Sequence, residues 1–150
     1  MLIDMNSNIK NLLTQDQCLS RNSITFGNGK IILLDIRRRN KYYIWPIIDC
    51  KIEDYLKYNH DKFASFDVFA QTIFENFEIY VGDGSSEENG NIHVIDNRNK
   101  SLVWFAFFED SEPFTQVNVD KNGIINALSE SGIIWKIPIE TPLKIDLEYP

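Results

Sequence analysis

The second half of the chain alternates hydrophobic and polar residues with a period of two, which is typical of β-strands. The alternation recurs in five short segments, at residues 79–81, 92–95, 117–119, 124–128 and 133–137. Turn residues separate these segments, and Asp120–Gly123 gives the strongest turn signal because Asn-Gly accepts the positive φ of a tight hairpin. We therefore expect an antiparallel meander of about five to seven strands.

One segment in this region, Leu102–Phe108, is apolar at every position. A strand without polar side chains would expose apolar surface on whichever face met solvent, so both of its faces should be covered. We expect this segment to be a central strand of the sheet.

The first half also contains strand-like segments. Ser23–Phe26 is followed by the turn signal Gly27–Gly29, and residues 30–36 then form an apolar run of strand length. A second run, Tyr42–Ile48, contains Pro46, which cannot donate a hydrogen bond to a ladder. This second run should therefore be an edge strand or a strand with a break.

Two helices are predicted between these regions, besides a weak helical turn around Ile9 and Leu12. The first covers Lys51–Tyr58, with Asp49 as its N-cap. The second begins after Ser65 and runs from Phe66 to Phe77, because apolar residues follow Phe66 at offsets of 3, 4, 7, 8 and 11. The predicted fold is α+β, with one or two helices packed on one face of the antiparallel β-meander.

The composition is that of one soluble globular domain spanning residues 1–150. A chain of this length buries a core without disulfide bonds, and Cys18 and Cys50 have no metal-ligand spacing around them. We therefore expect free thiols, no metal and no cofactor. Met1–Met5 does not resemble a signal peptide, and no apolar run reaches the roughly 18 residues of a membrane span. A cytoplasmic protein without a membrane partner is the expectation.

The net charge of −7 is unevenly distributed along the chain. Residues 75–120 hold ten Asp/Glu and two Lys/Arg, so this segment carries the whole negative excess. Such a field repels nucleic acid and attracts a cationic partner, although it also serves solubility. The only basic cluster, residues 37–41, is either a contact for phosphate or an acidic partner, or a solvated hairpin tip. We favour the tip because no aromatic stacking platform is apparent beside it.

No catalytic motif is visible. The two histidines are His60, in a polar connector, and His93, on the expected outward side of a strand. No spacing typical of a nucleophile elbow, a zinc protease or a P-loop occurs. Asp83 with His93 offers the one conceivable acid–base pair, as in a small hydrolase. A small acidic domain of this kind is more often a binding protein than an enzyme.

A run of motifs resembles immunity proteins of bacterial polymorphic toxin systems, including contact-dependent growth inhibition. The motifs are Val81-Gly-Asp-Gly-Ser85, Leu102-Val-Trp104, Ser111-Glu-Pro-Phe114 and Trp135-Lys-Ile-Pro138. The resemblance covers about residues 78–139. It implies a small cytoplasmic protein that binds one cognate toxin domain and neutralises it without catalysis. The toxins of these systems are often nucleases with basic active-site clefts.

The dense negative charge of residues 75–120 fits such a basic toxin domain. The candidate partner-binding residues are the carboxylates of the turns in this segment, namely Asp83, Glu87, Glu88, Glu109, Asp110 and Glu112. For Asp83 the alternative is a purely local role in its turn. Two other functions stay open: a structural or adaptor domain that self-associates through an edge strand, and the small hydrolase that uses Asp83 and His93.

Overall fold

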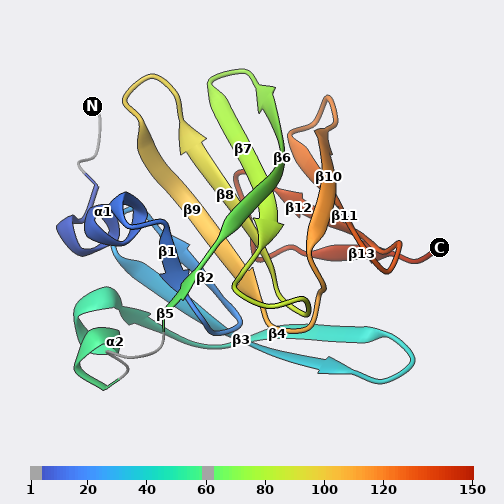
Figure 1. Ribbon diagram of the computed structural model, residues 1–150, viewed down its shortest axis with the longest axis horizontal. Helices are drawn as coiled ribbons and strands as arrows, with labels where there is room; N and C mark the ends of the chain where they lie inside the picture. Colours follow the sequence, from blue (N-terminus) through green and yellow to red (C-terminus); the bar gives the residue numbers. More distant parts are fainter. Residues whose placement is uncertain (1–4, 59–62) are drawn as a thin grey trace.

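The computed structural model describes residues 5–58 and 63–150, and His60 lies outside these ranges. The described part of the chain is built of antiparallel strands with two short helices (Figure 1). The elements in chain order are α1 (Ser7–Thr14), β1 (Gln17–Leu19), β2 (Ser23–Phe26), β3 (Lys30–Arg38), β4 (Tyr42–Lys51), α2 (Ile52–Tyr58), β5 (Phe63–Ser65), β6 (Asp67–Phe74), β7 (Phe77–Asp83), β8 (Gly90–Asp96), β9 (Ser101–Phe108), β10 (Phe114–Val119), β11 (Ile124–Ser129), β12 (Ile134–Pro138) and β13 (Asp146–Glu148).

The central sheet has seven strands in the order β4-β3-β2-β9-β8-β7-β6. It consists of two meanders, β2 to β4 and β6 to β9, which meet where β2 pairs with β9. The predicted antiparallel meander is thus confirmed, and β9 occupies the middle of the sheet as its apolar sequence predicted. β4, which contains Pro46, lies at one edge as expected.

Each face of the central sheet has its own core. A second sheet, with strand order β10-β11-β12-β13, packs on one face through Ile125, Trp135 and Ile137. The opposite face is covered by α1, α2 and the two-stranded β1–β5 sheet. The helices therefore lie on one face, as predicted for the α+β class.

The residues of β9 alternate between these two cores. Trp104 and Phe108 point into the core shared with the second sheet, whereas Phe105 and Phe107 point into the core beneath the helices. All four side chains are buried. This double burial is the physical reason for a strand without polar residues.

The helix predicted over Lys51–Tyr58 is present as α2, with Ile52 and Tyr55 buried. Its predicted N-cap is wrong: Asp49 belongs to β4, where it is paired with Ile32. The weak N-terminal turn is the full helix α1, capped by the Asn6 side chain.

The helix predicted from Phe66 to Phe77 is wrong. This segment contains β6 and the turn that leads into β7. Phe69 and Ile73, which a helix would have buried, are 50% and 68% exposed. After a bulge in the β6–β7 register, alternate residues of β6 are half-buried, with the period of a strand. Pairing with β7 along the whole strand therefore outweighs the helical spacing.

No helix in the described part of the chain is long and apolar enough to cross a membrane.

Candidate functional site

Two acidic loops meet at one end of the central sheet. We call them the acidic loops: residues 83–89, from the last residue of β7 to the start of β8, and residues 109–113 between β9 and β10 (Figure 1). They are joined directly, since the backbone N–H of Glu112 donates to the carbonyl oxygen of Glu88 at 2.8 Å. The pairing of β8 with β9, which places Gly90 opposite Phe108, brings them to the same end.

The contact between the acidic loops requires a glycine at position 90. A Cβ atom on Gly90 would lie 2.4 Å from Ser111 Oγ and 2.7 Å from the carbonyl oxygen of Glu112. The Ser111 hydroxyl also donates to that carbonyl, at 2.9 Å. Glu112 itself has a φ of 64°, an uncommon conformation for a residue with a side chain. The backbone here is thus held in a specific and close-packed arrangement.

The six predicted partner-binding carboxylates all lie on these loops. Glu87, Glu88, Glu109 and Asp110 are exposed, and Asp83 and Glu112 are partly buried. Within residues 5–58 and 63–150, none of the six forms an ion pair within 4.0 Å. The structure therefore brings the predicted residues to one end of the sheet, where the described part of the chain gives their carboxylates no ion-pair partner.

Asp83 also has a local role. One of its carboxylate oxygens accepts a hydrogen bond from the backbone N–H of Asp67, at 3.2 Å, where β6 begins. Its backbone carbonyl accepts from the side-chain amide of Asn91 on β8. Asp83 therefore links the last residues of β7 to both neighbouring strands, and of the six carboxylates it is the one tied most closely to the sheet.

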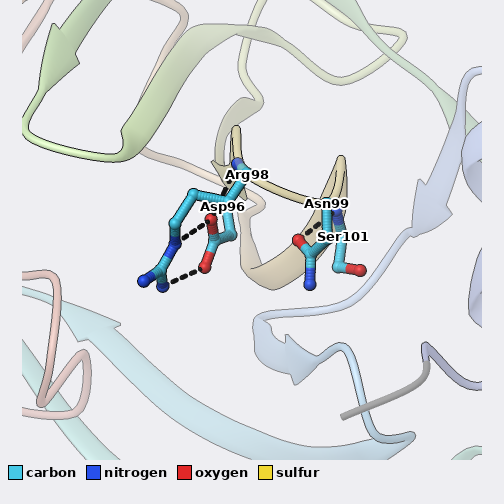
Figure 2. Close-up of polar contacts among 4 residues, drawn as sticks. All are labelled: Asp96, Arg98, Asn99 and Ser101. Carbon is cyan, nitrogen blue, oxygen red and sulfur yellow. Dashed lines mark hydrogen bonds and ion pairs between the residues drawn. The ribbon is translucent and has the colours of Figure 1, made fainter. Parts of the chain in front are cut away.

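The opposite end of the same strands shows the contrary arrangement (Figure 2). In the turn between β8 and β9, the guanidinium of Arg98 binds Asp96 through two hydrogen bonds of 3.0 and 2.7 Å. These hydrogen bonds are the main cause that lowers the pKa of Asp96. Lys100 lies 3.3 Å from Glu78. Both cations of residues 75–120 are thus paired at this end, far along the strands from the acidic loops.

The edge strand β4 has exposed apolar side chains and borders the second acidic loop, residues 109–113. β4 presents what we call the β4 apolar stripe: Tyr43, Trp45, Ile47 and Ile48 are 53%, 41%, 62% and 56% exposed. A hollow of about 450 Å³ is lined by both Ile47 and Glu109. Asn22 also lines it and accepts a 2.7 Å hydrogen bond from the Glu109 backbone N–H. Acidic and apolar groups therefore border one depression.

Sequence reasoning missed this stripe and the aromatic groups beside the basic cluster. Arg37 lies over the Trp45 ring at 5.6 Å, and Arg38 lies over the Tyr42 ring at 5.2 Å. The Tyr42 hydroxyl donates to the carbonyl oxygen of Asp110 at 2.7 Å, so this hairpin also touches the second acidic loop. The alternate spacing of Tyr43, Trp45 and Ile47 indicates one apolar face of a strand, but it does not show whether that face is buried or exposed.

His93 is buried, which corrects the prediction that it faces outward. Its ring lies between Phe66 and Phe105, with ring centroids 4.2 and 5.2 Å away. The alternation of β8 is as predicted, but its second face is also covered. Burial lowers the pKa of His93 to about 3, so the imidazole is neutral at physiological pH.

Asp83 and His93 do not form an acid–base pair. The register places Asp83 opposite Gly90 and His93 opposite Tyr80, three positions further along. The Nδ1 atom of His93 is hydrogen-bonded to Asn91 instead, at 3.0 Å. Both described cysteines are free thiols, as predicted. No cluster of three or more potential metal ligands occurs in residues 5–58 and 63–150.

Comparisons with known proteins add no relative: no family model matches the chain, and the search of curated proteins gives no match.

Proposed function

We propose that this chain is a cytoplasmic immunity protein that binds and neutralises a cognate toxin domain, one-to-one and without catalysis. The observation that supports this most directly is that, among the described residues, the carboxylates of the acidic loops form no ion pair, whereas Asp96 and Glu78 at the other end of the same strands are paired. The toxin domain would be basic at its contact surface, as expected of a nuclease cleft.

The physical argument rests on how charge acts in association. Exposed carboxylates without intramolecular partners produce a negative potential that raises the association rate of a cationic surface and fixes its orientation. Asp96 and Glu78 are paired with Arg98 and Lys100, so they attract a cationic partner less strongly. A basic toxin domain would therefore bind at the end of the sheet that carries the acidic loops.

The apolar side chains beside the acidic loops can provide binding affinity, which charge alone does not provide. Stable interfaces combine a buried apolar centre with a polar rim, and a few large side chains carry most of the affinity. Ile47, beside the hollow that Glu109 also lines, is suited to the centre. Glu87, Glu88 and Asp110 are suited to the rim.

The direct test is binding and protection with the toxin domain encoded immediately upstream. The two proteins are purified together, and the association rate and affinity are measured at low and high salt. We expect a stoichiometric complex, rescue of cells that express the toxin domain, and association that slows as salt rises. Absence of both complex and rescue would overturn the proposal.

Charge variants then locate the contact. Replacing Glu87 and Glu88 by Gln should slow association and reduce its salt dependence. The matched control replaces Glu75 and Glu140 by Gln, because both are exposed and lie outside the acidic loops. Equal effects of the two double variants would show that only net charge matters and that the acidic loops are not the contact.

A second candidate function is supported by a different observation, the exposed β4 apolar stripe. β4 is an edge strand, and an exposed apolar edge is a template for pairing with another strand. We propose as the alternative an adaptor or structural domain that self-associates through β4.

Sedimentation of the purified chain over a range of concentrations separates the two candidates. Self-association through β4 predicts a dimer that Ile47→Lys abolishes. The control is Ile73→Lys on β6, the opposite edge, where the side chain is equally accessible. A monomer at every concentration, together with a tight toxin complex, excludes the alternative.

A further inference from the structure

A cavity lies on the helix-bearing face of the central sheet, and no residue of the acidic loops lines it. Its volume is about 470 Å³, within the usual range for small-molecule sites. Its walls come from α1, from strands β6 to β8 and from the segments beside them, and they are mainly apolar. The apolar lining residues are Met5, Leu13, Phe66, Val68 and Ile95; the others include Tyr80, His93 and Lys100.

Two hydrogen bonds, from Asn91 to Asp83 and between Asn91 and His93, indicate which ring nitrogen of His93 carries the proton. The side-chain amide N–H of Asn91 donates to the carbonyl oxygen of Asp83, which determines the orientation of the Asn91 amide. Its oxygen, Oδ1, faces His93 Nδ1 at 3.0 Å, and the tautomer with the proton on Nδ1 satisfies this contact. The other ring nitrogen, Nε2, is then left as an unprotonated acceptor.

Nε2 has no hydrogen-bond partner among the described residues, and His93 is only 3% exposed. Buried polar atoms are satisfied in most proteins, so an orphaned acceptor beside a cavity needs an explanation. Phe66 both stacks on the imidazole and lines the cavity. Because Nε2 is buried, a molecule bound in the cavity would reach it only if the Phe66 side chain moved.

We propose that this cavity binds a small apolar molecule that carries one hydroxyl or N–H donor, and that the donor hydrogen-bonds to Nε2 of His93. The apolar walls accommodate a ring or short chain, and the acceptor selects for the donor. A molecule without the donor leaves Nε2 unsatisfied, which is the interaction difference that produces selectivity.

The test uses indole as the probe and indene as its matched control, because indene has the same bicyclic shape without an N–H. Binding to the full chain is measured by calorimetry and by changes in the backbone amide spectrum. We expect indole to bind about tenfold more tightly than indene, the factor that one satisfied hydrogen bond supplies. The imidazole ¹⁵N signal of Nε2 should shift with indole and not with indene.

Two variants examine the site independently. His93→Phe removes the acceptor but keeps an aromatic ring between Phe66 and Phe105, so it should bind indole and indene equally. Leu13→Trp leaves His93 unchanged but should fill the cavity from α1, and it should weaken both probes at least tenfold. If His93→Phe does not fold, Leu13→Trp and the ¹⁵N signal still decide the question.

Three results would overturn the proposal: no binding of either probe up to its solubility limit, equal affinity of the unmodified chain for both, or indole binding that leaves the His93 signal unchanged. The last two would show that an apolar surface, and not Nε2, determines binding. The test is separable from that of the toxin complex, because no side chain of the acidic loops lines the cavity.

Discussion

The indole N–H of Trp104 donates to the backbone carbonyl of Ile139, at 2.9 Å, and so connects the central strand to the segment that follows β12. Both groups lie in the core between the two sheets, where water is excluded. Trp135, also fully buried in this core, has an Nε1–H without a hydrogen-bond partner among the described residues.

We therefore expect the substitution Trp→Phe to lower the free energy of unfolding by different amounts at positions 104 and 135. Trp104→Phe leaves the Ile139 carbonyl unsatisfied, which should cost about 1–3 kcal/mol beyond the loss of packing. Trp135→Phe loses packing only. Urea unfolding of both variants measures the difference in the free energy of unfolding, and equal destabilisation would contradict the role assigned to the Trp104 hydrogen bond.

Gly90→Ala should destabilise the protein by about 1–3 kcal/mol, because its Cβ would overlap the Glu112 carbonyl and the Ser111 hydroxyl. The displaced loop should also lose the hydrogen bond between Glu112 and Glu88. Urea unfolding tests the first effect and hydrogen exchange at the Glu112 amide tests the second. Gln116→Ala, at an exposed position on β10, serves as the control and should change neither.

Stability should fall as the pH decreases below about 6.5, in part because of His93. Burial lowers the pKa of His93 from 6.5 to about 3 in the folded chain. Between these values the unfolded chain binds a proton that the folded chain does not, so the contribution is complete above pH 6.5 and is lost as pH falls. The slope is at most about 1.4 kcal/mol per pH unit.

The measurement compares urea unfolding of the unmodified chain and His93→Gln between pH 5 and 7, a window in which ordinary carboxylates titrate little. The variant should lose this part of the pH dependence. His60 and the carboxylates are common to both proteins and cancel in the difference. Parallel profiles would show that His93 is accessible to protons in the folded state.

Thiol reagents should distinguish the two cysteines. Burial raises the pKa of Cys18 to about 12, which leaves about a thousandfold less thiolate than the ordinary value of 9.0 gives. Cys50 is half-buried, and burial with nearby Asp54 and Asp49 raises its pKa as well. Mass spectrometry after iodoacetamide at pH 8 should find Cys50 labelled first and Cys18 only on unfolding; rapid labelling of native Cys18 would contradict its burial.

The sequence predicted the sheet well where one local pattern had one interpretation. Leu102–Phe108 predicts a central strand because an uninterrupted apolar run of strand length requires cover on both faces. The helix predicted after Phe66 is wrong because its apolar spacing includes Phe69 and Ile73, which β6 leaves exposed. Only the partner strand β7 distinguishes a strand from a helix here, and a local pattern does not contain it.

The candidate site was predictable to a similar extent. Charge density marked the carboxylates, because the acidic loops are short and their charges must lie near the surface. The exposure of Trp45 and Ile47 was not predictable, since apolar residues on a strand normally indicate burial. Nor was the burial of His93, which depends on Phe66 and Phe105 lying against the same face of the sheet.

The pairing of β2 with β9 has a consequence for synthesis on the ribosome. Ser23 is aligned with Phe107. β2 therefore has no β9 to pair with until more than 100 residues of the chain have been synthesised. Closing so long a loop is entropically slow, and until then β2 is an unprotected edge on a nascent chain. We expect the hairpin of β3 and β4 to form early, and the central sheet to become continuous only after β9 has left the exit tunnel.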